Sequence, residues 1–86
     1  MHTVMGMAKV GQVGGFSIYV IARSKHGNNY VKIKGKGGNI LGKFRLDVWE
    51  WEDVLDISSS DRKKILAWLS LNLKLITRKI EELPRK

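Results

Sequence analysis

Apolar and polar side chains alternate through three short segments of the first half of the chain, and this alternation limits the fold most strongly. The segments are residues 16–23, 29–35 and 39–47. Successive side chains of a β-strand point to opposite faces, so alternation is typical of strands with one buried face. Glycine and asparagine clusters between the segments indicate turns. The sequence therefore predicts an antiparallel sheet of three to four strands, the fourth being residues 3–10.

The alternation also assigns the side chains to the two faces of the predicted sheet. The apolar face is expected to hold Phe16, Ile18, Val20, Val31, Ile33, Ile40, Phe44 and Leu46. The opposite face is expected to hold Tyr19, Ile21, Arg23, Tyr30, Lys32, Lys34, Lys36, Leu41, Lys43 and Arg45. One face thus has to be covered by another element, while the other gathers basic residues and two tyrosines.

Residues 58–83 have the pattern of one long amphipathic helix. Ser58 and Asp61 have the spacing of a capping box, and Pro84 ends the segment. A continuous apolar stripe is formed by Ile65, Leu69, Leu73, Ile76, Ile80 and Leu83. A second apolar patch beside it is formed by Trp68, Leu71 and Leu75. The predicted fold is therefore α+β, with one long C-terminal helix packed on one face of the sheet.

The apolar surface of this helix is wider than packing against one sheet requires. Either the N-terminal strand or residues 48–55 cover the surplus, or the surplus is a homodimer or partner interface. Residues 48–57 carry two tryptophans among several acids and form a connector or an edge strand. Their acids either neutralise the basic sheet or offer a surface to a basic partner. The interface candidates are Trp49, Trp51, Trp68, Leu71 and Leu75.

A chain of 86 residues forms one small domain, and its net charge of +8 is distributed unevenly. Residues 1–46 contain basic side chains and no carboxylate, whereas the bases and acids of the remainder cancel. This asymmetry is typical of a surface that binds a polyanion, although a basic sheet face also serves solubility. The candidates for contact with nucleic acid are Tyr19, Arg23, Lys25, Tyr30, Lys32, Lys34, Lys36, Lys43 and Arg45.

The glycines suggest a phosphate loop, but the match is incomplete. Gly37, Gly42 and Lys43 have the spacing of a Walker A motif, while Phe44 replaces the magnesium-binding Ser or Thr. The segment also alternates as a strand, whereas that motif leads into a helix. The glycines are better explained as turn residues. We therefore expect no nucleotide loop and no cofactor.

Side chains for metal binding and catalysis are scarce. His2 and His26 are the only histidines, and the chain has no cysteine, so we expect no metal site. No Ser–His–acid or Cys–His arrangement is visible, which leaves a ribonuclease based on His26 as the enzymatic alternative. The lack of cysteine and of an apolar N-terminal span favours a cytoplasmic protein without a membrane segment.

The chain resembles an uncharacterised bacterial domain family over residues 15–83. The resemblance rests on "GGFSIYV", "YVKIKGKGG", "FRLD" and the helix "DRKKILAWLSLNLKLITRKIEEL". Family members carry a His-x-Pro-Pro-His-x-His hairpin, of which this chain keeps His26. Asn28 and Asn29 replace the prolines, and Tyr30 and Lys32 replace the other histidines. A metal or catalytic role of that cluster therefore does not carry over.

The resemblance implies a compact α+β fold and genes often located near toxin–antitoxin or mobile-element loci. Together with the charge distribution, it leads to non-enzymatic binding of DNA or RNA through phosphates as the expected function. The alternative is a protein–protein interaction module, such as a toxin–antitoxin component or an inhibitor.

Overall fold

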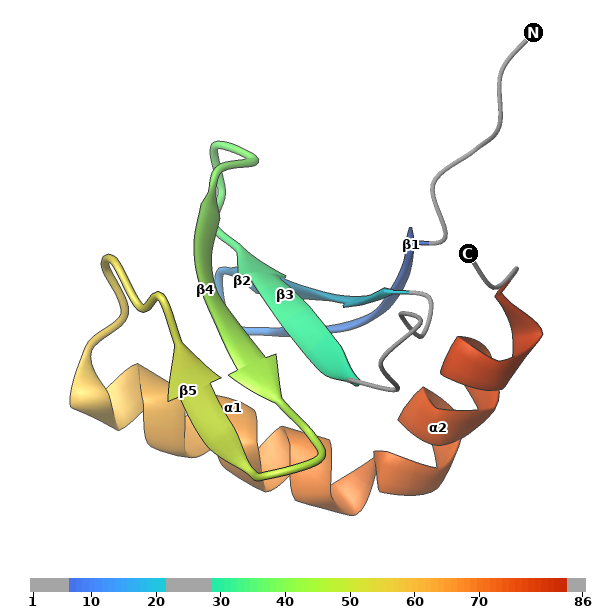
Figure 1. Cartoon of the computed structure of the whole chain (residues 1–86). Coiled ribbons are helices and arrows are strands. Elements are labelled where there is room, and N and C mark those ends of the chain that lie inside the picture. The colour runs from blue at the N-terminus through green and yellow to red at the C-terminus, as the bar shows by residue number, and fades with distance from the viewer. Residues whose placement is uncertain (1–6, 22–28, 84–86) are drawn as a thin grey trace, which may run out of the picture.

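The computed structural model describes residues 7–21 and 29–83. Within them the elements follow in the order β1 (Met7–Val13), β2 (Phe16–Ile21), β3 (Tyr30–Lys34), β4 (Ile40–Arg45), β5 (Glu50–Glu52), α1 (Ser59–Leu71) and α2 (Leu73–Glu82). The strands form one antiparallel sheet in sequence order, and both helices lie on the same face of it (Figure 1). The predicted α+β class is confirmed, with five strands in place of three to four and two helices in place of one.

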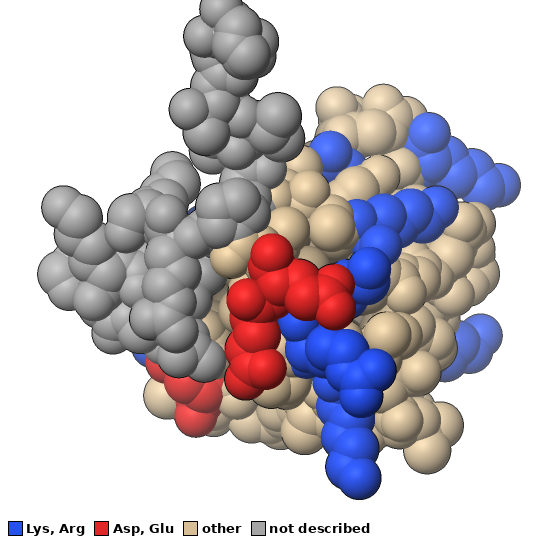
Figure 2. All heavy atoms as spheres, turned by 90° about the vertical axis from the view of Figure 1, so that its right-hand side faces the viewer, with Lys and Arg blue, Asp and Glu red and all other residues tan. Residues whose placement is uncertain are grey.

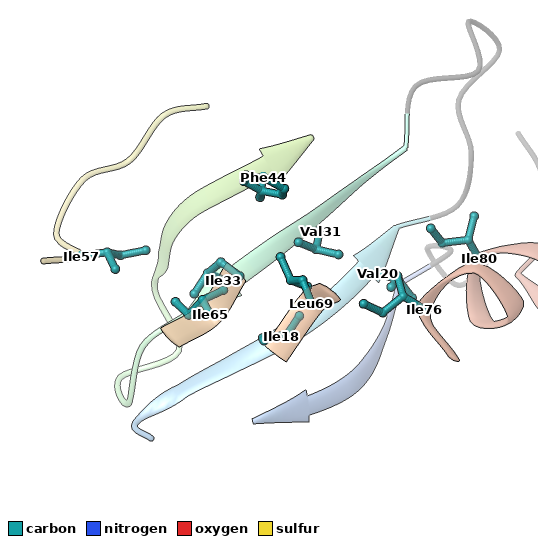
Figure 3. Close-up of a cluster of buried hydrophobic side chains, with 10 residues drawn as sticks. All are labelled: Ile18, Val20, Val31, Ile33, Phe44, Ile57, Ile65, Leu69, Ile76 and Ile80. Carbon is teal, nitrogen blue, oxygen red and sulfur yellow. The ribbon is translucent and has the colours of Figure 1, made fainter. Parts of the chain in front are cut away.

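The hydrophobic core lies between the sheet and the helices. Ile18, Val20, Val31, Ile33 and Phe44 are fully buried on the helix-facing side of the sheet, as the alternation predicts. Figure 3 shows Ile65, Leu69 and Ile76 of the helices next to the side chains of these strands. The buried residues from outside the sheet are Ile57, Ile65, Leu69, Ile76 and Ile80.

Two β-bulges change the faces that simple alternation assigns. In β1 the register shifts between Lys9 and Gly11, so Gly11 lies opposite Ile18 on the helix-facing side. The same shift leaves Lys9 and Gln12 on one face, where Lys9 Nζ donates to Gln12 Oε1 at 3.1 Å. Of the strand predicted at residues 3–10, the described part, residues 7–10, lies in β1, which continues to Val13; residues 1–6 lie outside the described residues.

The second bulge lies in β4 and corrects the predicted place of Ile40. Lys34 pairs with Ile40 and Ile33 pairs with Gly42, so Leu41 is the extra residue. Leu41 packs against the core, whereas Ile40 is 39% exposed. The extra residue reverses the alternation at this point, which the spacing of apolar residues alone does not reveal.

The helical segment begins as predicted and breaks at Asn72. Ser58 Oγ accepts a hydrogen bond from the Asp61 N–H at 3.1 Å, which caps α1. The Asn72 side chain donates from Nδ2 to the Trp68 carbonyl oxygen at 2.9 Å, and its backbone leaves the helical region at φ −115° and ψ 22°. Asparagine favours such local hydrogen bonds over a continuing helix. This break corrects the prediction of one long helix.

The break directs α2 toward β1 and β2, where Ile76 and Ile80 are buried. It also removes Leu73 from the predicted apolar stripe, since this side chain is 41% exposed. In the described part of the chain, no helix has the length and apolar character needed to cross a membrane.

Candidate nucleic-acid interface

One row of side chains runs across all five strands on the face opposite the helices. The strand register pairs Lys9 with Tyr19, Tyr19 with Lys32, Lys32 with Lys43, and Lys43 with Glu52. Directly paired residues of neighbouring strands share a face, so these five side chains form one line from β1 to β5. We call the β1–β3 part of this face, with Lys9, Tyr19, Tyr30, Lys32 and Lys34, the lysine–tyrosine face.

Each tyrosine of the lysine–tyrosine face has an ammonium group over its ring. Lys34 Nζ lies 4.5 Å from the centre of the Tyr19 ring, and Lys43 Nζ lies 5.6 Å from that of Tyr30. A cation–π contact at an exposed site contributes about 0.5–1 kcal/mol, whereas a base stacked on an aromatic ring contributes about 1–3 kcal/mol. An aromatic ligand that displaces Lys34 would therefore free its ammonium group, whereas the ammonium group of Lys43 also lies 3.3 Å from Asp53 Oδ2.

The bases of β4 are paired with the acids that follow them. Lys43 Nζ lies 3.3 Å from Asp53 Oδ2. Arg45 forms a two-atom contact with Asp47, through Nε at 3.1 Å and Nη2 at 2.6 Å, and its Nη1 lies 3.9 Å from Glu52 Oε2. β5, together with the acids on either side of it, thus forms an acidic edge that neutralises the neighbouring part of the sheet. Figure 2 views the molecule from the side of α2, on the right of Figure 1, and shows acidic side chains next to basic ones on that side as well.

The contact between Arg45 and Asp47 also changes the acidity of the carboxylate. The hydrogen bond from Arg45 lowers the pKa of Asp47 below its usual range, and the Val48 N–H, 3.1 Å from Asp47 Oδ1, acts in the same direction. A depressed pKa in the folded state stabilises the fold above the unfolded-state pKa, and this contribution is lost as the pH falls through the folded-state value. Asp47 therefore stays charged and keeps Arg45 occupied at neutral pH.

Removing acids from the β5 side should strengthen binding of a polyanion. Glu52→Gln and Asp53→Asn together release Lys43 and one contact of Arg45, and asparagine suits the positive φ of 51° at position 53. We expect the affinity for nucleic acid at low salt to rise roughly three- to tenfold. The slope of log K against log salt should become steeper by the contribution of about one phosphate contact. The measurement is a titration by fluorescence anisotropy.

The matched control is Asp56→Asn with Glu81→Gln, which changes the net charge equally. Both side chains are exposed and lie outside the ion pairs formed by the described residues. Equal gains for the two double variants would mean that net charge, and not the release of Lys43 and Arg45, determines the affinity.

The structure brings together part of the predicted binding set. Tyr19, Tyr30, Lys32 and Lys34 share the lysine–tyrosine face, and the exposed Lys36 lies in the turn between β3 and β4. Arg23, Lys25 and the two histidines lie outside the described residues. Lys9 is an addition to the predicted set, because the β1 bulge that directs it to this face has no clear signal in the sequence beyond Gly11.

The tryptophans among the predicted interface residues pack against the chain itself. The Trp49 and Trp51 rings meet Phe44 edge-on, with ring centres 4.8 and 5.2 Å away. Trp49 does so from a left-handed backbone conformation with φ 58°, which is uncommon for a bulky residue. Trp68 covers Gly11 of β1, so the N-terminal strand takes up part of the helix's surplus apolar surface.

Leucines around the break between the helices remain open to solvent. Leu71 is 85% exposed, and Leu73 and Leu75 are each 41% exposed. They line a shallow depression of about 450 Å³ together with Lys74 and other residues of the break. Of the predicted interface residues, Leu71 is therefore by far the most exposed, while Leu75 and Trp49, at 41% and 39%, are exposed to a similar fraction.

The described residues contain no cluster of three or more His, Cys, Asp or Glu side chains able to hold a metal ion. Comparison of the chain with family models, with curated proteins and with solved structures found no match.

Proposed function

We propose that the protein binds nucleic acid without enzymatic activity, mainly by contacts of the lysine–tyrosine face with phosphates. The observation that carries the proposal is the row from Lys9 through Tyr19 to Lys32, with Lys34 beside it on β3. Among the described residues, none of these lysines has a carboxylate in ion-pairing distance. Among the described residues, Glu52 of β5 and Asp53, which follows it, pair with Arg45 and Lys43 and with no lysine of this row.

The pairing of like charges supports the same conclusion. Lys32 lies directly opposite Lys43 on the neighbouring strand, and like charges in this position destabilise a sheet. A phosphate between the strands would replace this repulsion with attraction. Asp53 compensates the charge of Lys43, whereas Lys32 has no acidic partner among the described residues, so an anionic ligand would be favoured next to Lys32.

The test is a titration of the wild-type protein with DNA and RNA oligonucleotides at several salt concentrations. Each phosphate contact contributes about −0.9 to the slope of log K against log salt for duplex DNA, and about −0.7 for single strands. Four lysines, Lys9, Lys32, Lys34 and Lys36, would give a slope of about −3 to −4. Absence of binding at low salt, or binding independent of salt, contradicts the proposal.

A second candidate function is protein–protein interaction, for which the exposure of Leu71, Leu73 and Leu75 is the specific observation. Exposed leucines that adjoin one depression are typical of a contact surface. A second copy of the chain is the first partner to test. The family resemblance, with its toxin–antitoxin context, suits this candidate as well as the first.

Sedimentation equilibrium tests the self-association. We expect a mass above the 9.8 kDa of one chain at high protein concentration. Leu71→Ser with Leu75→Ser should return the mass to that of the monomer, while the melting temperature changes little because both side chains are exposed. A wild-type monomer at all concentrations would contradict the homodimer.

A further inference from the structure

We propose that the lysine–tyrosine face binds single-stranded nucleic acid in preference to a duplex, with bases stacked on Tyr19 and Tyr30. This inference rests on the proposed function and names the class of ligand. Three features of the structure carry it: the place of the helices, the arrangement of the two rings, and the lysines that lie over them.

The helices lie on the face of the sheet opposite the lysine–tyrosine face, so they cannot enter the groove of a duplex bound to that face. A protein usually reads the major groove with an α-helix or a two-stranded ribbon. Here α1 and α2 lie on the opposite face, and their buried side chains form the core (Figures 1 and 3). The turn between β3 and β4 contributes one basic residue, Lys36, among glycines. Among the described residues, the elements next to the lysine–tyrosine face therefore supply few side chains that can reach base edges in a groove.

The two tyrosines lie on adjacent strands around one lysine. Tyr19 on β2 is the direct partner of Lys32 on β3, and Tyr30 lies two residues before Lys32 on the same strand and hence on the same face. Two rings with a cation between them suit two bases and the phosphate that links them. In a duplex the bases are paired and stacked inside the helix, so their faces are inaccessible to such rings.

The lysines above the rings show that the ring faces can be reached from the open side. Lys34 Nζ lies 4.5 Å from the centre of the Tyr19 ring, and Lys43 Nζ lies 5.6 Å from that of Tyr30. A base that takes the place of an ammonium group stacks on the ring. The flexible side chain of Lys34, which has no acidic partner among the described residues, then moves to the adjoining phosphate, whereas Lys43 stays next to Asp53. Stacking and phosphate contact are thereby gained together, which a duplex with the same phosphate charge does not provide.

The experiment compares three ligands of equal length: a dT20 strand, a dT20·dA20 duplex and a 20-unit abasic strand that keeps the phosphates without the bases. Anisotropy titrations use the full chain at one low salt concentration, with rU20 as the RNA counterpart. We expect dT20 or rU20 to bind at least about tenfold more tightly than both the duplex and the abasic strand. The comparison with the abasic strand needs no variant, so it does not depend on whether a substitution disturbs folding.

Variants of the tyrosines provide the second arm. Tyr19→Leu with Tyr30→Leu should weaken binding of dT20 by roughly tenfold or more while changing duplex binding less than about twofold. Tyr19→Phe with Tyr30→Phe keeps the rings and should retain the preference for single strands.

The outcomes separate the inference from the proposed function. No binding of any of the ligands would refute both. Duplex binding as tight as dT20 binding would leave the proposed function standing and overturn the inference. Equal affinity for dT20 and the abasic strand, or full retention of dT20 affinity by the leucine variants, would overturn it as well.

Discussion

Replacing Lys32 and Lys34 together by glutamate is expected to abolish nucleic-acid binding, with a loss of at least about 100-fold at low salt. The double change removes two phosphate contacts and adds two negative charges at the centre of the lysine–tyrosine face. Folding should be preserved, because Lys32→Glu places opposite charges across β3 and β4 where two lysines now face each other. Anisotropy titration measures the binding, and a thermal melt measures the folding.

The matched control is Lys63→Glu with Lys64→Glu, which changes the net charge by the same amount on the exposed side of α1. We expect the affinity of this variant for nucleic acid to fall less than about tenfold, because only long-range electrostatic attraction is weakened. Equal losses for the two double variants would show that binding follows the net charge of the protein and has no site on the sheet.

The second large effect concerns stability and the packing of Trp68 on β1. A Cβ atom at position 11 would overlap Trp68 Cζ2, so Gly11→Ala forces the indole out of its place. We expect this substitution to reduce the free energy of unfolding by about 1–3 kcal/mol, as overpacking of a core typically does. Urea unfolding followed by circular dichroism measures the change.

Two comparisons identify the clash as the cause. Gly37→Ala meets no atom closer than 4.0 Å and should leave stability nearly unchanged. In a Trp68→Ala background, Gly11→Ala should not reduce the free energy of unfolding further. The double variant should therefore be more stable than the sum of the two single effects predicts. Additive effects would mean that Gly11 is required for its backbone conformation instead of its size.

The buried residues of the sheet were the most predictable part of the fold. The alternation around Val31 and Ile33 placed Ile18, Val20 and Phe44 on the same side, and all five are fully buried. Such a pattern is reliable because period two is a property of the strand backbone and needs no knowledge of the rest of the fold.

Features that depend on one extra residue or one side-chain hydrogen bond were not predictable in this way. The bulge at Leu41 exchanges the places of Ile40 and Leu41, and the Asn72 side chain divides the helix although the apolar stripe continues past it. Both are local events that the surrounding packing selects. The break at Asn72 leaves Leu73 exposed, although the stripe predicts that it is buried.

In the candidate site, too, the sequence predicted the kinds of residue, and the structure decided which of them are paired. The sequence identified Lys32, Lys34, Lys43 and Arg45 as a basic face and suggested that nearby acids neutralise it. Only the strand register decides which of them the acids reach: Lys43 and Arg45 are paired, and among the described residues Lys32 and Lys34 have no acidic partner. Charge composition is independent of pairing, whereas a salt bridge depends on distances of a few ångströms.

By itself, the sequence determined the α+β class, the buried face of the sheet, the capped start of α1 at Ser58 and the excess of basic residues in the first half. Each of these follows from spacing along the chain or from composition. The tertiary structure decided the fifth strand, the break at Asn72, the addition of Lys9 to the basic row and the packing of Trp68 on Gly11. These depend on which segments become neighbours in space, and that is settled only when the sheet and helices pack together.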